Sequence, residues 1–317
     1  MPSVMLAPRR LLGAAAALVV ALLAIRALAS DPANFGIVLL NGLTAASLYF
    51  LVAAGFTLIF GVLRVTNLAH GSLYLLGAYV GYSLIQRTGN WLVGLVGAGL
   101  AIAVLGVLIQ QVVLRRVQGD PLREALVTIG LSIVAADLSL AFWGSQALDL
   151  GIPEALDRSV ELPGGIVFSA YRLSFLALAV VTGVGLWALL RHTRLGVTIR
   201  AIVDDSPMAS VLGVNANVVF AVVFALGAFL AGAAGVAGAS YLSISPGEDS
   251  RYLLLSLLVV IIGGLGSVLG AAIGAVAIGV IEAFAQVYLP TYSVLITFGA
   301  MVAVLAFRPQ GILGKTS

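Results

Sequence analysis

The most constraining feature of this sequence is a succession of long apolar runs that very few charges interrupt. Of its 317 residues, 61% are hydrophobic and only 9% are charged, whereas soluble domains carry about 25% charged residues. Within hydrocarbon, only helices and closed barrels satisfy their own backbone hydrogen bonds. Because the runs are continuous and do not alternate with a period of two, we predict an all-α fold, a polytopic bundle of membrane helices.

Ten runs are candidate membrane spans, since about 20 residues cross a bilayer. They cover Leu11–Ala29, Ile37–Phe60, Leu68–Ile85, Leu92–Leu114, Ala125–Trp143, Leu173–Leu190, Val218–Tyr241, Tyr252–Leu265, Val268–Tyr288 and Ser293–Phe307. The eighth is too short for a straight crossing and runs into a Gly-Gly-Leu-Gly sequence, which is typical of a broken helix or of close packing. The spans use up the chain, so we expect residues 1–317 to form one membrane domain.

The first span has two interpretations. Arg9 and Arg10 precede an apolar run from Leu11 to Ile25, which Ala27-Leu28-Ala29 follows. This pattern also fits a secretory signal with an A-x-A cleavage site. We favour a retained helix, with residues 1–36 forming this helix and an outer linker. Cleavage would leave the topology of the following spans unchanged.

Basic residues orient the spans, because cytoplasmic loops carry an excess of Lys and Arg. With the N-terminus inside, the cytoplasmic segments hold Arg9, Arg10, Arg64, Arg115, Arg116, Arg123, Arg191, Arg194, Arg200, Arg308 and Lys315. The outer loops hold only Arg87, Arg158, Arg172 and Arg251. We therefore expect both termini in the cytoplasm, an outer loop at 144–172 and a cytoplasmic segment at 191–217. That loop divides the spans five and five, which predicts two inverted halves, a transporter plan.

Composition excludes several kinds of chemistry. The chain has no cysteine, so disulfides, thiolate catalysis and sulfur-ligated metals are excluded. His70 and His192 have no second ligand at metal-site spacing, and the basic residues are too scattered for a nucleic-acid surface. Gly314-Lys315-Thr316 resembles the end of a phosphate-binding loop, but Pro309 stands where that motif needs glycine. We expect no cofactor in this chain, so any ATP would be bound by partner subunits.

Glycines recur at helical spacing towards the C-terminus. One stripe comprises Gly266, Gly270 and Gly274, which follow Gly263 and Gly264, and a second comprises Gly232, Gly235 and Gly238. Such stripes let helix backbones approach closely in lipid. We interpret them as packing surfaces, and a solute path lined by backbone is the alternative.

The long polar stretch at 191–217 contains a predicted short amphipathic helix. Asp204, Asp205 and Ser206 could cap a helix that begins at Pro207. Its apolar face would comprise Met208, Ala209, Val211 and Leu212. Flanking arginines suit either docking into a groove on a partner protein or an interfacial position on anionic lipid, and the pattern leaves both open.

Four polar side chains are expected at membrane depth, where such groups usually face the interior of a bundle. Asn67 and His70 lie three residues apart, on one face of a helix. They either tie a helix end together or line a path or gate. Asp137 and Glu282 either make structural hydrogen bonds or ion pairs, or serve as proton sites.

Motifs with a fixed order extend along most of the chain. The first part runs from Asn41-Gly42-Leu43 through Tyr49 to Asn67-Leu68-Ala69-His70-Gly71. The later parts are Gly196, Arg200-Ala201, Asp204, Met208-Ala209 and Gly213-Val214, then Ile262 to Ser267 with Gly270, Gly274 and Glu282, and Arg308 to Gly314. Over Asn41–Gly314 the sequence resembles the permeases of branched-chain amino acid ABC importers, of the type with an Asn-x-Ala-His-Gly motif.

This resemblance implies a transport subunit, not an enzyme, in the bacterial inner membrane. The implied partners are a second related permease or a copy of this chain, two cytoplasmic ATPase subunits and an external solute-binding protein. The residues implied to couple to the ATPases are Leu195, Gly196, Arg200, Ala201, Asp204, Met208, Ala209 and Gly213. Those expected along a path or gate are Asn41, Tyr49, Asn67, His70, Gly71 and Glu282.

The cargo follows less directly. The main hypothesis is branched-chain or related amino acids, but permeases similar to this one also serve urea, short amides and aromatic or other carboxylic acids. Ser72 stands where the family often has an acidic residue. Two hypotheses from other classes are a proton-coupled secondary transporter that uses Asp137 or Glu282, and an intramembrane enzyme, which would need a nucleophile–base pair or a metal cluster.

Overall fold

The computed structural model describes residues 32–308 and 310–313, and most of them are helical. The helices are α2 (Pro32–Leu63), α3 (His70–Thr88), α4 (Trp91–Leu108), α5 (Arg115–Val117), α6 (Pro121–Trp143), α7 (Ala170–His192), α8 (Arg194–Asp204), α9 (Ser206–Val211), α10 (Ala216–Ala239), α11 (Glu248–Gly263), α12 (Val268–Tyr288) and α13 (Ser293–Phe307). A π-helical stretch at Ile109–Leu114 joins α4 to α5, and single 3-10 turns lie at Glu154–Leu156 and Pro290–Tyr292. Strands β1 (Ser159–Leu162) and β2 (Ile166–Ser169) pair antiparallel.

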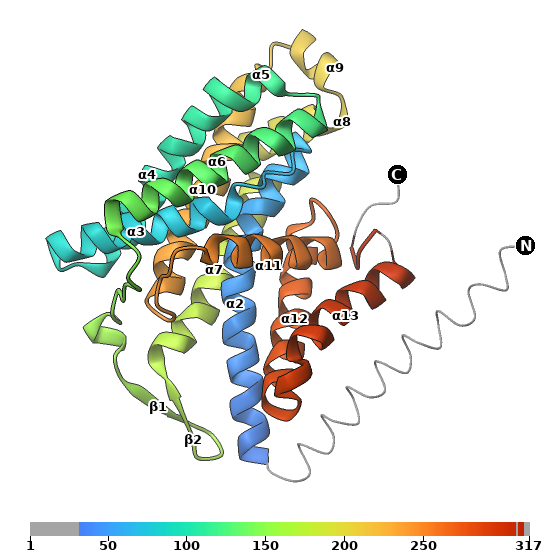
Figure 1. Ribbon diagram of the computed structural model, residues 1–317. Coiled ribbons are helices and arrows are strands. Elements are labelled where there is room, and N and C mark those ends of the chain that lie inside the picture. The colour runs from blue at the N-terminus through green and yellow to red at the C-terminus, as the bar shows by residue number, and fades with distance from the viewer. Residues whose placement is uncertain (1–31, 309, 314–317) are drawn as a thin grey trace, which may run out of the picture.

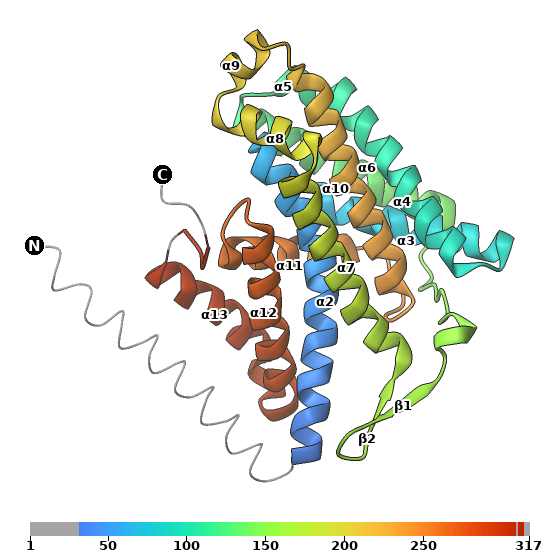
Figure 2. The same ribbon diagram turned by 180° about the vertical axis from the view of Figure 1, so that it is seen from behind.

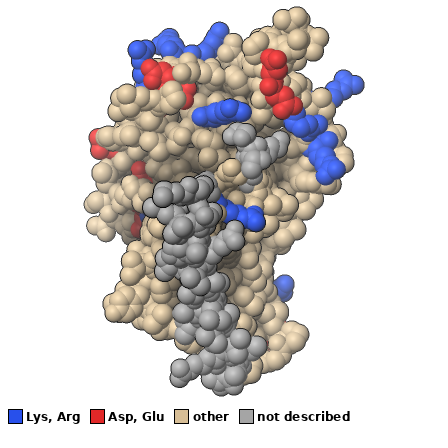
Figure 3. Space-filling model, turned by 90° about the vertical axis from the view of Figure 1, so that its right-hand side faces the viewer, with Lys and Arg blue, Asp and Glu red and all other residues tan. Residues whose placement is uncertain are grey.

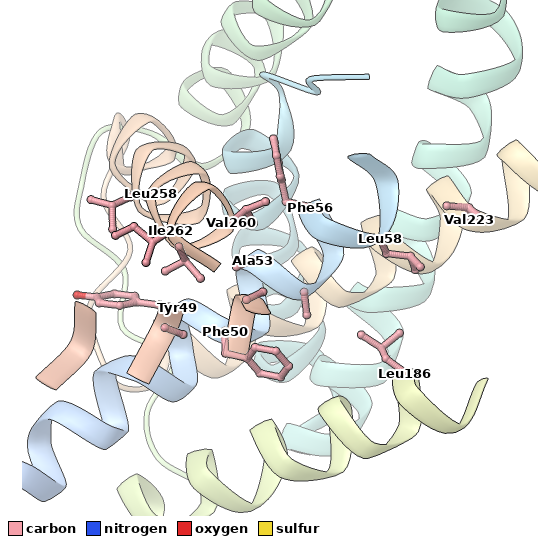
Figure 4. Packing of buried hydrophobic residues seen from close by; sticks show 14 of the residues in the cluster. Tyr49, Phe50, Ala53, Phe56, Leu58, Leu186, Val223, Leu258, Val260 and Ile262 are labelled. Carbon is pink, nitrogen blue, oxygen red and sulfur yellow. The ribbon is translucent and has the colours of Figure 1, made fainter. Parts of the chain in front are cut away.

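Helix α2 is the central column of the bundle (Figures 1 and 2). Its 32 residues make a helix about 48 Å long at 1.5 Å per residue, and it contacts α7, α8, α10, α11 and α12. Residues 46–59 are buried all round the helix, as the uniformly apolar sequence of α2 predicts. Tyr49 and Phe50 leave α2 on different sides, with Phe50 directed towards Leu186 of α7 (Figure 4).

A group of helices on one side of α2 is packed through small residues. It consists of α3, α4, α6 and α10, with α10 against both α3 and α4. A Cβ atom on Gly77 of α3 would overlap the backbone of Gly232 on α10, and one on Gly235 would overlap the carbonyl oxygen of Tyr74. These crossings need glycine because the backbones themselves are in contact.

Helices α11 and α12 form a tight hairpin beside α2. Helix α11 has 16 residues and ends at the glycine run, where Gly264 (φ +106°) and Gly266 (φ +79°) adopt conformations that other residues rarely reach. The backbone N–H groups of Ile312 and Leu313 donate to carbonyl oxygens in the last turn of α11 at 2.8 and 3.0 Å. The C-terminal segment thereby satisfies acceptors that a helix end otherwise leaves open.

The two ends of the bundle differ. At one end, called the hairpin end below, β1 and β2 form a β-hairpin in the connection between α6 and α7 (Figure 1). At the α9 end, α8 and α9 extend beyond α2, and Asp205 caps α9 by accepting the Met208 backbone N–H at 2.9 Å. Asp204 is the last residue of α8. Most basic atoms on the face drawn in Figure 3 lie towards the α9 end.

Each predicted span after the first coincides with a helix to within a few residues. In the described ranges, seven helical segments are long and apolar enough to cross a membrane, and α3 and α11 are not among them. The all-α polytopic architecture is confirmed, with the short β1–β2 hairpin as an addition. The first span, Leu11–Ala29, lies outside the described residues, so the count of ten, the inverted halves and the side of the termini stay predictions.

Candidate functional site

A polar cavity of about 350 Å³ lies between α2, α7, α11 and α12, towards the hairpin end. Its lining comprises Val38, Asn41, Ala45, Leu48, Tyr49, Arg172, Tyr241, Leu242, Arg251, Tyr252, Leu255, Glu282, Ala283, Gln286 and Val287. Cavities of about 300–1,000 Å³ are typical small-molecule sites. The structure brings together three residues that the sequence placed on a path or gate: Asn41, Tyr49 and Glu282.

Glu282 of α12 is positioned by two neutral donors. The Tyr49 hydroxyl donates to Oε2 at 2.5 Å, and the Gln286 amide donates to Oε1 at 3.0 Å. No cation in the described part of the chain forms an ion pair with this carboxylate. An ionised carboxylate has about four acceptor sites, so Glu282 keeps acceptor capacity for a further group in the cavity.

Arg172 lies in the first turn of α7 and is fixed from two directions. Its Nη1 donates to Asn41 Oδ1 at 2.8 Å. Its guanidinium carbon lies 5.0 Å from the ring centre of Tyr241 and 5.9 Å from that of Phe168. Because a guanidinium has five N–H donors, this side chain retains donors beyond the one that Asn41 accepts.

Arg251 supplies a second positive charge from the first turn of α11. Its side chain is 55% exposed, and it lies 3.6 Å from Glu248, which makes a long ion pair one turn back on the same helix. The cavity lining therefore contains two guanidinium groups and one carboxylate, and Glu282 forms no ion pair with either arginine. Neither arginine is predicted as a site residue from the sequence, although both are among the few basic residues assigned to outer loops.

The motif residues Asn67, His70 and Gly71 lie outside the cavity lining, in the packing of α3 against α2 and α11. His70 is fully buried, and its Nε2 lies 3.0 Å from the Val52 carbonyl oxygen. Asn67 is also buried, and its Oδ1 accepts a backbone N–H at the start of α3. A Cβ atom on Gly71 would overlap the Asp249 carbonyl oxygen. These contacts join helices, and a gating role for the three residues remains a prediction.

Helix α8 is anchored to the bundle. Arg200 donates a hydrogen bond to the carbonyl oxygen of Leu190, in the last turn of α7. Ile199 and Ile202 pack into the main apolar cluster, which also contains Phe56 and Leu58 of α2. A movement of α8 would therefore act on both α2 and α7, the two helices that carry Tyr49 and Arg172.

The coupling residues predicted from the sequence divide into an inward and an outward set. Gly196 and Ala209 are buried and Leu195 is half-buried, whereas Arg200, Ala201, Asp204, Met208 and Gly213 are exposed. Of the apolar face predicted for α9, Ala209 packs inward, but Met208, Val211 and Leu212 are exposed, with Val211 82% exposed. An exposed apolar tip of this kind suits a partner surface.

The C-terminal glycines lie at backbone contacts of the α11–α12 hairpin. Cβ atoms on Gly263 and Gly270 would overlap each other's backbone, and one on Gly274 would lie 2.6 Å from the Val259 carbonyl oxygen. A Cβ atom on Gly266 would lie 3.1 Å from the Cα atom of Gly61 in α2, and one on Gly311 would lie 2.6 Å from that of Gly264. Each position is filled by backbone, as expected for helix packing.

Asp137 differs from Glu282. It is exposed on α6 and forms no hydrogen bond or ion pair with another described residue. The structural bonds expected for it are therefore not found in this part of the chain.

Comparison with known proteins identifies the family. Residues 38–305 match the family described as branched-chain amino acid transport system / permease component. The chain is 34% identical to the high-affinity branched-chain amino acid transport system permease protein LivH of Escherichia coli K12, over 87% of this chain and 94% of that protein. It is 31% identical to the corresponding permease protein BraD of Pseudomonas aeruginosa, over 87% of this chain and 95% of that protein. The chain belongs to the branched-chain amino acid transport permease family.

Proposed function

We propose that this chain is the membrane permease subunit of an ATP-driven importer for branched-chain or related amino acids. The observation that carries the proposal is the placement of two surfaces on one bundle. A charged cavity lies towards the hairpin end, and an exposed apolar helix tip lies at the α9 end. Family membership and the relatives named as branched-chain amino acid permeases support the cargo class.

The proposed orientation places the α9 end in the cytoplasm and the hairpin end outside. The gathering of basic residues towards the α9 end (Figure 3) supports it, because positive charge is retained on the cytoplasmic side. The hairpin end would then receive solute from an external binding protein. The α9 tip would dock into a groove on an ATPase subunit, which would bind the ATP.

The proposed mechanism is alternating access. Closure of two ATPase subunits on ATP would press on α8 and α9. Since α8 contacts both α2 and α7, that force would reach the helices that line the cavity. Partner binding can shift a two-state equilibrium only by its differential affinity for the two states. The second permease, a relative or a copy of this chain, would complete the path.

Uptake measurements test the proposal. Cells with and without this chain are given radiolabelled leucine, urea or benzoate, and the assay is repeated after deletion of the ATPase subunit. We expect leucine uptake to be lost in both deletions. Loss of only urea or benzoate uptake would keep the mechanism and change the cargo. Leucine uptake that needs this chain but not the ATPase would contradict the proposal and favour a proton-coupled transporter.

The docking surface gives a second prediction. Val211→Asp places a charge on the exposed tip of α9, where it disturbs no internal packing. Leucine uptake should fall at least about tenfold, because an unpaired charge at an apolar interface costs more than about 1.4 kcal/mol. The tagged permease should also lose the ATPase during co-purification.

Val167→Asp is the matched control, since Val167 is an exposed valine on β2, at the opposite end. It should leave co-purification unchanged. Retention of the ATPase by the Val211 variant at normal expression would show that α9 is not the docking element. Arg200→Glu, which breaks the link between α8 and α7, should reduce uptake while the subunit remains inserted.

A further inference from the structure

We infer that the cavity between α2, α7, α11 and α12 binds a zwitterionic α-amino acid, with Arg172 and Arg251 receiving its carboxylate and Glu282 its ammonium group. This inference rests on the proposed function and adds to it the chemistry by which the permease itself recognises solute. It depends on two guanidinium groups and one carboxylate that line the same cavity, with no ion pair between Glu282 and either arginine.

The positive side of the cavity is pre-organised. Asn41 and the Tyr241 ring hold the Arg172 guanidinium, so it loses little side-chain freedom when a ligand arrives. Arg251 has only a long ion pair, 3.6 Å, to Glu248. Guanidinium groups bind carboxylates through two parallel N–H donors, and both arginines have donors to spare.

The Glu282 carboxylate, on the negative side of the cavity, is also held in place before a ligand binds. Glu282 is held by Tyr49 and Gln286, two neutral groups that orient the carboxylate without neutralising it. A bound ammonium group would give Glu282 a direct ion pair, which no described residue makes with it. A charge-assisted hydrogen bond of this kind is about twice as strong as a neutral one.

Apolar residues complete the lining and suit an aliphatic side chain. They include Val38, Leu48, Leu242, Leu255 and Val287. A ligand that combines both charges with a branched hydrocarbon would match all three parts of the wall.

The alternative cargoes fit this wall less well. A carboxylic acid without an amine would meet the arginines but would leave Glu282 unpaired beside a second negative charge. Urea or a short amide carries no charge, so it would leave Arg172 and Glu282 without an ion pair. Enclosing an unpaired charge is costly, so the cavity should discriminate against both classes of solute.

Equilibrium binding to the purified complex of permease and ATPase subunits tests this inference. The external binding protein is left out, because its own specificity would otherwise dominate the measurement. Radiolabelled leucine is bound to the purified complex in lipid nanodiscs and displaced by unlabelled leucine, 4-methylpentanoate, 3-methylbutylamine or urea. The last three lack the ammonium, the carboxylate or both. Each should need at least about tenfold higher concentration than leucine for half-displacement, because each leaves a charged group unpaired.

The variants assign the two sides. Glu282→Gln should weaken leucine binding at least about tenfold. It should also reduce the difference in affinity between leucine and 4-methylpentanoate. Arg172→Gln and Arg251→Gln should weaken the binding of both leucine and 4-methylpentanoate. Arg158→Gln and Glu161→Gln are the matched controls, since both residues are exposed near the hairpin and outside the cavity lining, and both should bind leucine normally. Elution of the intact complex and its basal ATP hydrolysis verify folding.

Two results would overturn the inference: leucine binding that the cavity variants leave unchanged, or a wild-type complex with no preference for leucine over the analogues. Either result, combined with intact ATP-dependent leucine uptake, would remove the cavity assignment and leave the proposed function standing. Loss of ATP dependence in the wild type would instead remove the proposed function.

Discussion

Gly71 shows at the residue scale why a motif position can be restricted by packing. Its Cα lies against the Asp249 carbonyl, and the next residue, Ser72, donates to the Asp249 carboxylate at 3.0 Å. Gly71→Ala should therefore separate α3 from α11 and lower stability by about 1–3 kcal/mol, the usual cost of overpacking. The midpoint of thermal unfolding in detergent measures it.

Gly130→Ala is the control for this substitution. Gly130 is also helical, but a Cβ atom there meets nothing within 4 Å. Alanine at that position should leave the midpoint unchanged or raise it, because alanine favours a helix by about 1 kcal/mol over glycine. Equal effects of the two substitutions would refute the packing explanation.

The C-terminal segment matters at the scale of the element, because it completes the end of α11. The Ile312 N–H donates to the Ile262 carbonyl oxygen at 2.8 Å. Ile312→Pro removes this donor, whereas Ile312→Ala keeps it and removes only side-chain packing. The proline variant should be less stable than the alanine variant by about 0.5–1.5 kcal/mol, the net value of one hydrogen bond. Equal unfolding midpoints would mean that the segment contributes through its side chain alone.

At the scale of the whole molecule, the proposed orientation predicts which end of the bundle faces the external medium and which faces the cytoplasm. The chain contains no cysteine, so single cysteines give an unambiguous signal. Glu161→Cys at the hairpin should react with a membrane-impermeant maleimide in intact cells. Val211→Cys at the tip of α9 should react only after permeabilisation. The reverse pattern would invert the topology, and the unsubstituted chain provides the background.

The sequence by itself determined that the chain is a bundle of membrane helices, and it located their ends closely, down to Ser293 and Phe307 of α13. It could do so because burial of backbone in lipid leaves little alternative to a helix, and because apolar run length is a local property. Glycine spacing likewise indicated packing, and the motifs identified the family.

Only the tertiary structure decided which polar residues share a site. Tyr49 and Glu282 are separated by 233 positions in sequence, yet they form one hydrogen bond. His70 belongs to the same N-terminal motif as Tyr49, but it is buried outside the cavity, where its ring contacts the Val52 carbonyl oxygen of α2. The sequence assigns Arg172 and Arg251 to outer loops. In the structure they lie in the first turns of α7 and α11, and both line the same cavity. Periodicity specifies the face of a helix but not the neighbour that this face meets. The meeting of distant charges is a property of the packed bundle, where helix crossings set by glycine contacts fix which side chains converge.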